Sequence, residues 1–486
     1  MPTLFTAFHA GDRCVFERTF TAQDFEAFAR LSGDRNALHH DAAHAASTRF
    51  GRTVVPLHVT SSPLSMVAGM VFPGEPSLYL GHEVRASLPV FYGERLVYSA
   101  RIVSINAPQR TLDLRVLAIR GADVVLDATM RVQATAAEWA SRSDMPVIAH
   151  DAGARALVTG ATGAIGSAVA LDLARRGWSL LLQDRADDAR RAALRSTLER
   201  FQADVRFVGA DLATPAGRTT LAEAVSGCDD LGAVVHCASP GVDATLETLV
   251  DVNYRALQQV AEAAVPALLA RQQGAILLVG STAMTRHVAG MADYAAAKTM
   301  AATIVNGIEA RFAPFGVRGL TLMPGFVATP FSAPLRHDAA ALSPEEVADA
   351  VASMIERPPL LNTLVLEAGR RVEGQFGFRS AATAPRPRGA EDDAAVAVAA
   401  TSAPATDASA PSRVAAIVAR ELGLPARFDM ADAELGATPG WDSLKQIDIV
   451  LALESALGVS FSSAELSAMT SVAELEAVCR RRAGAQ

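Results

Sequence analysis

The sequence has little cysteine, and its four cysteines are scattered. They lie far apart and form no CxxC pair, so neither a zinc site nor a disulfide framework fits Cys14, Cys228, Cys237 and Cys479. We therefore expect a reducing, cytoplasmic compartment and no metal.

Long apolar runs and blocks of one charge are also missing. No stretch of about 18 consecutive apolar residues occurs, and the first residues lack the basic start and apolar run of a signal peptide. With 44 Lys+Arg against 52 Asp+Glu, the net charge is −8 and no basic block is present. We expect no membrane and no nucleic-acid partner.

The composition shows none of the extremes of fibrous or disordered chains. Its 34 glycines and 24 prolines exclude a collagen-like chain, and 50% hydrophobic with 20% charged residues suits buried cores. At roughly 100–200 residues per domain, the 486 residues predict two to four domains.

Two composition changes divide the chain. Residues 380–412 contain no aromatic residue, no Leu and no Ile, which predicts a flexible Ala/Pro-rich linker, with a long surface loop as the alternative. A weaker break near 136–152 separates two patterns. Before it, segments such as LVYSARIVSI alternate with period two, as in β-strands. After it, short apolar strands alternate with helical segments, which predicts a doubly wound parallel sheet.

The first strand of this second region runs into the glycine-rich segment TGATGAIG at 159–166, and a helix follows. Glycines let a backbone turn tightly and approach a pyrophosphate at a helix N-terminus. Asp184 ends the next strand, where a carboxylate can accept hydrogen bonds from a ribose. Without its context such a turn is weak evidence for a nucleotide site, and the alternative for Asp184 is a solvated residue at the end of a strand.

A second motif lies downstream, where Tyr294 and Lys298 share one helix face at i and i+4. An ammonium near a phenol lowers the phenol pKa, so we expect Tyr294 to exchange a proton with a carbonyl oxygen. Ser281, at the end of a preceding strand, can hydrogen-bond that oxygen. A YxxxK pair alone is usually a helix with a buried ring, but here it accompanies the serine and the glycine turn.

Together these motifs resemble the short-chain dehydrogenases/reductases over residues 153–375, and we place the Rossmann domain at 151–378. The resemblance implies a catalytic tetrad of Asn253, Ser281, Tyr294 and Lys298. HCAS at 236–239 departs from the NNAG that the family often carries. Besides Tyr294 and Lys298, the implied cofactor-binding residues are Thr159, Gly160, Gly163, Ile165, Gly166, Asp184, Asp211, Leu212, Pro324, Gly325 and Thr329.

The cofactor is NAD or NADP, and the sequence slightly favours NAD. Asp184 would repel a 2′-phosphate, whereas the adjacent Arg185 could bind one.

The N-terminal region places Asp34 and His39 five residues apart after an amphipathic helix. Such a pair can serve as acid and base, although both residues are also ordinary in loops. GDRNALH resembles the GDxNPxH of MaoC-like (R)-hydratases, which implies an α+β hotdog domain over residues 1–140 with Asp34, His39 and Ser65 catalytic. Pro56-Leu57 stands where the family has His-Gly, so a degenerate hotdog that only binds or dimerises stays an alternative.

The C-terminal region, 413–486, contains Asp442-Ser443-Leu444 before an amphipathic helix. Asp442 could simply cap that helix. The segment resembles an acyl carrier protein, which implies an all-α four-helix domain with 4′-phosphopantetheine on Ser443.

The three resemblances predict one reaction sequence. A 3-oxoacyl thioester on Ser443 is reduced to the (3R)-3-hydroxyacyl group and then dehydrated to trans-2-enoyl, in polyketide or specialised fatty-acid biosynthesis. A phosphopantetheinyl transferase and separate ketosynthase and acyltransferase proteins are the expected partners, and we expect a homo-oligomer. The alternatives are a carrier-fused ketoreductase with an inactive hotdog and a non-catalytic acyl-carrier scaffold.

Overall fold

The structure is a computed structural model that describes residues 7–75, 77–135, 148–149, 153–185, 188–286, 288–332, 341–359, 361–368, 370–374, 413–422 and 471–483, together with Ala433, Thr438, Ile449 and Leu453. The linker expected at 380–412 and Ser443 lie outside these residues. The chain divides into two compact units, residues 1–381 and 382–486.

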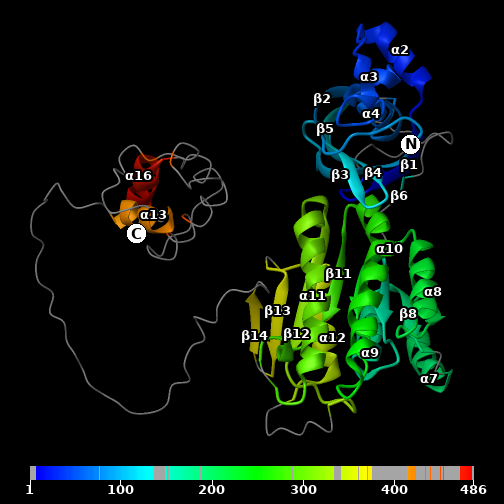
Figure 1. The fold of residues 1–486 in the computed structure, drawn as a ribbon, viewed down its shortest axis with the longest axis vertical. Coiled ribbons are helices and arrows are strands. Elements are labelled where there is room, and N and C mark those ends of the chain that lie inside the picture. The colour runs from blue at the N-terminus through cyan, green and yellow to red at the C-terminus, as the bar shows by residue number, and fades with distance from the viewer. Residues whose placement is uncertain are drawn as a thin grey trace, which may run out of the picture. The chain divides into compact units, whose positions relative to one another are not determined.

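The first unit begins with an antiparallel sheet in the order β2-β5-β4-β3-β1-β6 (Figure 1). Its strands are β1 (Arg13–Thr19), β2 (Ser77–Ala86), β3 (Arg95–Asn106), β4 (Thr111–Arg120), β5 (Asp123–Ala134) and β6 (Ile148–Ala149). The period-two pattern of the sequence correctly predicts β3 and β4. Alternation places Leu96, Tyr98 and Ala100 on the buried face of β3.

The buried face of this sheet packs against a short helical stretch. The stretch comprises α4 (Leu57–Ser61), α5 (Pro63–Met66) and the π-helical turn η2 (Val67–Val71). Val59, Leu64 and Val67 join one apolar core with the strands, and the Tyr98 hydroxyl donates to the Thr60 carbonyl at 2.6 Å. A curved antiparallel sheet around an apolar helix confirms the predicted hotdog fold.

Three further helices lie before that stretch. They are α2 (Ala22–Ser32), the 3₁₀ turn η1 (Ala37–His39) and α3 (Ala42–Ala46). The α2 bounds match the amphipathic segment in the sequence. Gly33 ends α2 in the left-handed region at φ 78°, where glycine lacks the Cβ penalty.

The second sheet of this unit has the order β14-β13-β12-β11-β10-β7-β8-β9. Its strands are β7 (Arg155–Thr159), β8 (Ser179–Asp184), β9 (Val205–Gly209), β10 (Leu231–His236), β11 (Gly274–Val279), β12 (Val317–Pro324), β13 (Thr363–Glu367) and β14 (Arg370–Gly374). All neighbours pair in parallel except β13 and β14. The prediction of a parallel sheet therefore needs one correction, the antiparallel edge strand β14.

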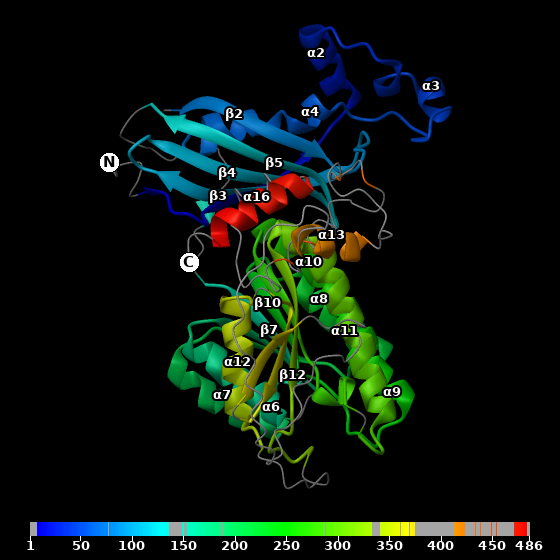
Figure 2. The ribbon, with the colours of Figure 1, turned by 90° about the vertical axis from the view of Figure 1, so that its left-hand side faces the viewer.

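Helices cover both faces of this sheet, as Figure 2 shows. One face packs against α8 (Pro215–Ser226), α10 (Ala256–Arg271) and α11 (Ala292–Phe312), and the other against α6 (Ala164–Arg175), α7 (Asp188–Leu198) and α12 (Pro344–Glu356). This is the predicted doubly wound Rossmann arrangement. The remaining elements are α9 (Leu246–Val250), the π-helical turn η4 (Asp251–Arg255) and the 3₁₀ turns η3 (Glu199–Phe201), η5 (Thr282–Met284) and η6 (Ala313–Phe315).

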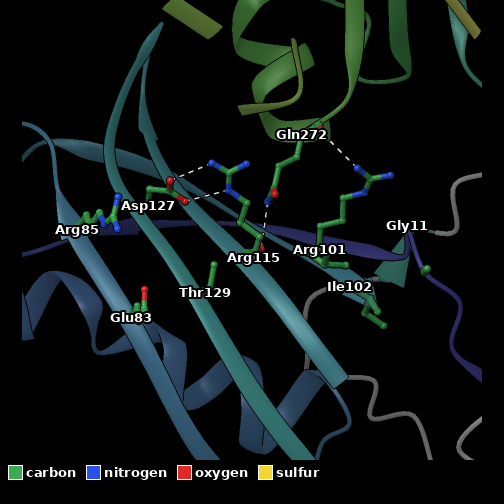
Figure 3. A pocket seen from close by; sticks show the side chains of 11 residues that line it. Gly11, Glu83, Arg85, Arg101, Ile102, Arg115, Asp127, Thr129 and Gln272 are labelled. Atoms are coloured by element: carbon green, nitrogen blue, oxygen red, sulfur yellow. Dashed lines mark hydrogen bonds and ion pairs between the residues drawn. The ribbon is translucent and has the colours of Figure 1, made fainter. Parts of the chain in front are cut away.

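The outer face of the hotdog sheet contacts the end of α10. Gln272 follows α10 in the left-handed region at φ 53°. Its side-chain amide donates to the Ser99 carbonyl at 2.8 Å and to the Arg115 carbonyl at 3.2 Å (Figure 3). Arg101 donates back to the Gln272 carbonyl. Because Gln272 precedes β11, this contact lies at the edge of the parallel sheet where β11 begins.

The described residues of the second unit include the helices α13 (Arg413–Leu422) and α16 (Val472–Ala483). Val418, Leu475 and Cys479 share a buried cluster with Ile449 and Leu453. The other two helices expected of a carrier fold fall outside the described residues. No helix in the described ranges is both long and apolar enough to cross a bilayer.

Candidate active site

The glycine turn follows β7 and leads into α6. Gly160 has φ +64°, and a Cβ there would lie 2.9 Å from the Cα of Ala238. A Cβ on Gly166 would lie 2.2 Å from the Gly160 carbonyl oxygen. Both positions therefore require glycine, one for its backbone conformation and both for close packing.

Two adjoining cavities share this turn, and both are lined by Gly160, Gly163 and Cys237. One cavity of about 420 Å³ extends toward Asp184, Asp211 and Leu212. The other, of about 480 Å³, is also lined by Ile165, Gly166, Tyr294, Lys298 and Thr329. A glycine-rich turn between two cavities fits a dinucleotide, whose pyrophosphate would lie at the start of α6.

Asp184 does not present the free carboxylate that the sequence suggested. Its side chain is fully buried, and both carboxylate oxygens accept from Arg191, at 2.6 and 2.9 Å. Arg185 and Arg190 line the same end of the cavity. Sequence reasoning missed Arg190 and Arg191, because spacing alone does not show which arginine of α7 turns back to the strand.

Tyr294 and Lys298 line the second cavity, and Ser281 directly follows Gly280, which lines it too. Ser281 follows β11 and caps η5, whereas Tyr294 and Lys298 lie on α11 and are both buried. Lys298 donates from Nζ to the Val279 carbonyl at 2.9 Å, and Nζ lies 6.0 Å from the centroid of the Tyr294 ring.

Burial governs the pKa values of these two groups. It raises the pKa of Tyr294 to about 12, opposed by a hydrogen bond with Ser281, and lowers the pKa of Lys298 to about 8. We expected Lys298 to lower the pKa of the phenol, and in this structure desolvation is the larger effect. Tyr294 is therefore a neutral phenol at neutral pH, the form that can donate a proton.

Four predicted residues of this domain lie behind the cavity walls. The Thr159 side chain is buried and contacts His236 instead. Asn253 is fully buried in η4, where its Nδ2 donates to the Leu249 carbonyl at 2.9 Å. Pro324 ends β12, and the Gly325 amide donates to the Leu366 carbonyl at 2.8 Å. These positions can support the site without lining it.

The hotdog domain brings Asp34 and His39 together. His39 Nε2 lies 3.9 Å from Asp34 Oδ2, and His39 Nδ1 lies 2.7 Å from the Val54 carbonyl oxygen. A carbonyl only accepts, so Nδ1 carries the proton and Nε2 of the neutral ring is left as a base. Asp34 accepts from the Asn36 amide at 3.0 Å. The Asn36 side chain in turn caps η1, the turn that carries His39. Asn36 therefore has a structural role between Asp34 and His39.

The other hotdog positions that the sequence singled out, Ser65, Leu57 and His58, make no hydrogen bond to Asp34 or His39 among the described residues. Ser65 lies exposed on α5. Leu57 begins α4, so its N–H has no intrahelical acceptor and can still serve as a donor. The His58 ring stacks on Phe28 rather than replacing the family histidine.

Sequence reasoning missed Tyr92 in this domain. Its hydroxyl is buried and has no hydrogen-bond partner among the described residues. Burial and the charges of Asp24 and Asp34 raise its pKa to about 12. The neighbouring Phe91 pairs with Val54 in an isolated antiparallel β-bridge. The Val54 carbonyl accepts the hydrogen bond from His39. Nothing in the residue pattern distinguishes this tyrosine from an ordinary core aromatic.

Three family profiles match the chain in order. The profile described as MaoC like domain matches residues 9–119, short chain dehydrogenase matches 154–340, and phosphopantetheine attachment site matches 412–479.

Individual relatives agree with the profiles. An (R)-specific enoyl-CoA hydratase of Aeromonas caviae is 35% identical over 114 residues, 23% of this chain and 85% of the relative. A 1-deoxy-11-beta-hydroxypentalenate dehydrogenase of Streptomyces avermitilis is 34% identical, over 40% of this chain and 78% of the relative. A very-long-chain 3-oxoacyl-CoA reductase of Anas platyrhynchos is 25% identical, over 44% and 70%.

Proposed function

Because this chain belongs to the MaoC-like and short-chain dehydrogenase families and carries a phosphopantetheine attachment segment, we propose that it reduces and then dehydrates a carrier-bound 3-oxoacyl thioester. The observation that carries the proposal is the position of Tyr294 and Lys298 on the cavity beside the glycine turn, with Ser281 hydrogen-bonded to Tyr294. The names of two relatives, a 3-oxoacyl-CoA reductase and an (R)-specific enoyl-CoA hydratase, support the substrate class.

The reductase step needs a proton donor and a fixed ketone oxygen. Tyr294 donates the proton, since its phenol is neutral at neutral pH, and the Ser281 hydroxyl hydrogen-bonds the same oxygen. Lys298 is held by the Val279 carbonyl beside the phenol. The nicotinamide, when bound, supplies the hydride. We infer the 3R product, because the hotdog family acts on that isomer.

Within this proposal the cofactor is NADP(H), although the sequence alone slightly favoured NAD. The argument for NAD required a free Asp184 carboxylate, and Arg191 neutralises that carboxylate through two hydrogen bonds. Arg185 and Arg190, which line the cavity end, provide positive charge for a 2′-phosphate.

The dehydratase step uses Asp34 and His39. One group removes the α-proton and the other assists departure of the hydroxide, and the free Nε2 of His39 makes it the more readily available base. The Leu57 amide at the start of α4 can hold the thioester oxygen. A hotdog that only binds or dimerises is the second candidate, because Leu57 replaces the family glycine at this donor.

The remaining parts of the proposal concern the carrier and its partners. Ser443 would carry 4′-phosphopantetheine, attached by a phosphopantetheinyl transferase, and separate ketosynthase and acyltransferase proteins would extend the chain. Domain bounds of 1–140, 151–378 and 413–486 stay part of the proposal, as does a cytoplasmic compartment, which the four free cysteines support. Leu78 and Leu80 on edge strand β2 are about half exposed, at 51% and 48%, which supports a homo-oligomer.

Consumption of NADPH with an acetoacetyl thioester tests this function in the full chain. We expect NADPH absorbance to fall, and an enoyl thioester to accumulate as the hydroxyacyl product loses water. Reduction without enoyl formation would favour the inactive hotdog. If NADPH is not consumed with thioesters of either coenzyme A or the carrier, the result would support the non-catalytic acyl-carrier scaffold and contradict the proposed function.

A further inference from the structure

A buried hydrogen-bonded bridge connects the glycine turn with the helix that carries Asn253. Its central residue is His236, the last residue of β10, which is fully buried and stands at the first position of HCAS. His236 Nδ1 lies 3.0 Å from Thr159 Oγ1, and Nε2 lies 3.1 Å from the Val252 carbonyl oxygen. None of the proposed catalytic steps uses this histidine.

The partners fix the direction of every hydrogen bond in the bridge. The Val252 carbonyl can only accept, so His236 Nε2 carries the proton. Burial and the charge of Lys298 lower the pKa of His236 to about 3, so the ring is neutral and Nδ1 accepts. Thr159 therefore donates to Nδ1, and its oxygen accepts from the Ala238 amide at 3.1 Å. Every hydrogen bond in the bridge therefore has one defined direction.

One end of the bridge adjoins the glycine turn, and the other lies in the turn that carries Asn253. Thr159 directly precedes Gly160, whose close approach to Ala238 sets the turn. Val252 lies in the π-helical turn η4, one residue before Asn253. Such turns are irregular backbone and need outside partners to hold one geometry. The histidine supplies a partner to a carbonyl of this turn.

A second tether runs in parallel to the same turn. Arg218 of α8 donates from Nη1 to the Leu212 carbonyl at 3.0 Å, and the same nitrogen lies 3.3 Å from Asp251 Oδ1. Leu212 lines the adenine side of the cavity, and Asp251 begins η4. Two polar side chains thus join loops on the cofactor side to the turn that holds Asn253.

We propose that His236 is a positioning residue, which holds the glycine turn and the Asn253 turn in register through Thr159 and Val252. This inference rests on the proposed reductase function for its effect on turnover. It predicts that substitutions at the two ends of the bridge have different effects. Loss of the Val252 end disturbs the catalytic geometry, whereas loss of the Thr159 end disturbs the turn that binds the cofactor.

Two substitutions of His236 test the Val252 end. His236→Gln places an amide nitrogen near the position of Nε2 and can still donate to Val252, whereas His236→Asn is too short to reach it. We expect kcat of His236→Asn to fall about tenfold or more, since small misplacements cost up to about 10²-fold. His236→Gln should keep at least about a third of kcat, and KM for the thioester should change little in either variant.

Two isosteric threonine substitutions test the Thr159 end without any thioester. Thr159→Val removes the hydroxyl that donates to His236 and accepts from Ala238, so we expect the Kd for NADPH to rise about tenfold, which corresponds to about 1.4 kcal/mol for a buried hydrogen bond. Thr321→Val is the matched control, because Thr321 is equally buried and its hydroxyl has no partner among the described residues. Its Kd for NADPH should stay within about twofold.

The two readouts separate this inference from the proposed function. The full chain could fail to reduce the thioester while Thr159→Val, but not Thr321→Val, weakens NADPH binding in a fluorescence titration. That result would support the bridge and contradict the proposed function. Equal NADPH affinities for Thr159→Val and Thr321→Val would overturn the bridge. So would a kcat of His236→Asn equal to that of His236→Gln, with thermal unfolding confirming that both variants are folded.

Discussion

The Tyr294 hydroxyl is the group on which the proposed reduction depends. Tyr294→Phe keeps the buried ring and removes the proton donor, so we expect kcat for the acetoacetyl thioester to fall about 10²–10⁴-fold. NADPH affinity should hardly change, because the glycine turn is untouched. Stopped-flow absorbance and a fluorescence titration measure the two quantities. A loss of kcat below about tenfold would mean that another group donates the proton.

In the proposed function, the positive charge of Arg185 and Arg190 at the Asp184 end of the cavity favours NADPH over NADH. Arg185→Ala and Arg190→Ala should each weaken NADPH about tenfold and leave NADH nearly unchanged, since a hydrogen bond to a charged group contributes about 1.5–3 kcal/mol. Arg195→Ala on α7 is the control, because Arg195 packs against Phe207 and lies outside the cavity lining. Titrations with both cofactors give the ratio, and equal losses for NADH and NADPH would contradict the assignment.

The acid–histidine pair of the hotdog domain is tested by Asp34→Asn. This change keeps the shape and removes the charge that faces His39, so enoyl formation from a (3R)-3-hydroxyacyl thioester should fall by about 10²-fold or more. Asp41→Asn is the matched control, since Asp41 only caps α3 and Asn caps equally well. Enoyl absorbance measures both. An unchanged rate in Asp34→Asn would remove this carboxylate from the mechanism.

At the scale of elements, the glycine turn makes the sharpest prediction. A Cβ on Gly166 would lie 2.2 Å from the Gly160 carbonyl oxygen, so Gly166→Ala must shift the turn, and both NADPH affinity and the unfolding temperature should drop. Gly307→Ala in α11 is the control, because nothing lies within 4 Å of its added Cβ. Alanine there should stabilise the helix by about 0.5–1 kcal/mol. Thermal unfolding with and without NADPH distinguishes the two, and equal NADPH affinities would show that the turn can adapt.

Sequence patterns predicted the elements that have a strong period or a fixed motif. The apolar strands β7, β8 and β10, the helix α2 and the glycine turn were all foreseen. Strand β14 was not, because Arg370–Gly374 is polar and gains its place only by pairing with β13. The π-helical turn η4 was also missed, since its sequence is that of an ordinary helix.

Sequence patterns predicted the site residues better than their surroundings. Tyr294 and Lys298 line one cavity with Ser281 hydrogen-bonded to Tyr294, and Asp34 Oδ2 lies 3.9 Å from His39 Nε2. The catalytic roles of these residues stay predictions. The ion pair of Asp184 with Arg191 and the buried bridge at His236 depend on side chains brought together by tertiary packing. Spacing along the chain carries no sign of them.

At the scale of the whole molecule, the hotdog and Rossmann domains share a polar contact around Gln272. This contact lies where β11 begins, whereas Ser281 follows the other end of β11. The cavity lined by Val279, Gly280 and Tyr294 therefore lies at the opposite end of β11 from the hotdog contact. An intermediate passing from one domain to the other needs a tether, which a pantetheine arm on Ser443 would provide.

Intact mass spectrometry of the loaded full chain tests most directly whether both domains act on one tethered group. The chain is first modified at Ser443 with an acetoacetyl pantetheine arm and then given NADPH. The arm should gain the mass of two hydrogen atoms and then lose the mass of one water. Tyr294→Phe should stop before the first change and Asp34→Asn before the second. An acetoacetyl arm that stays unchanged in the loaded wild-type chain would contradict the proposed function.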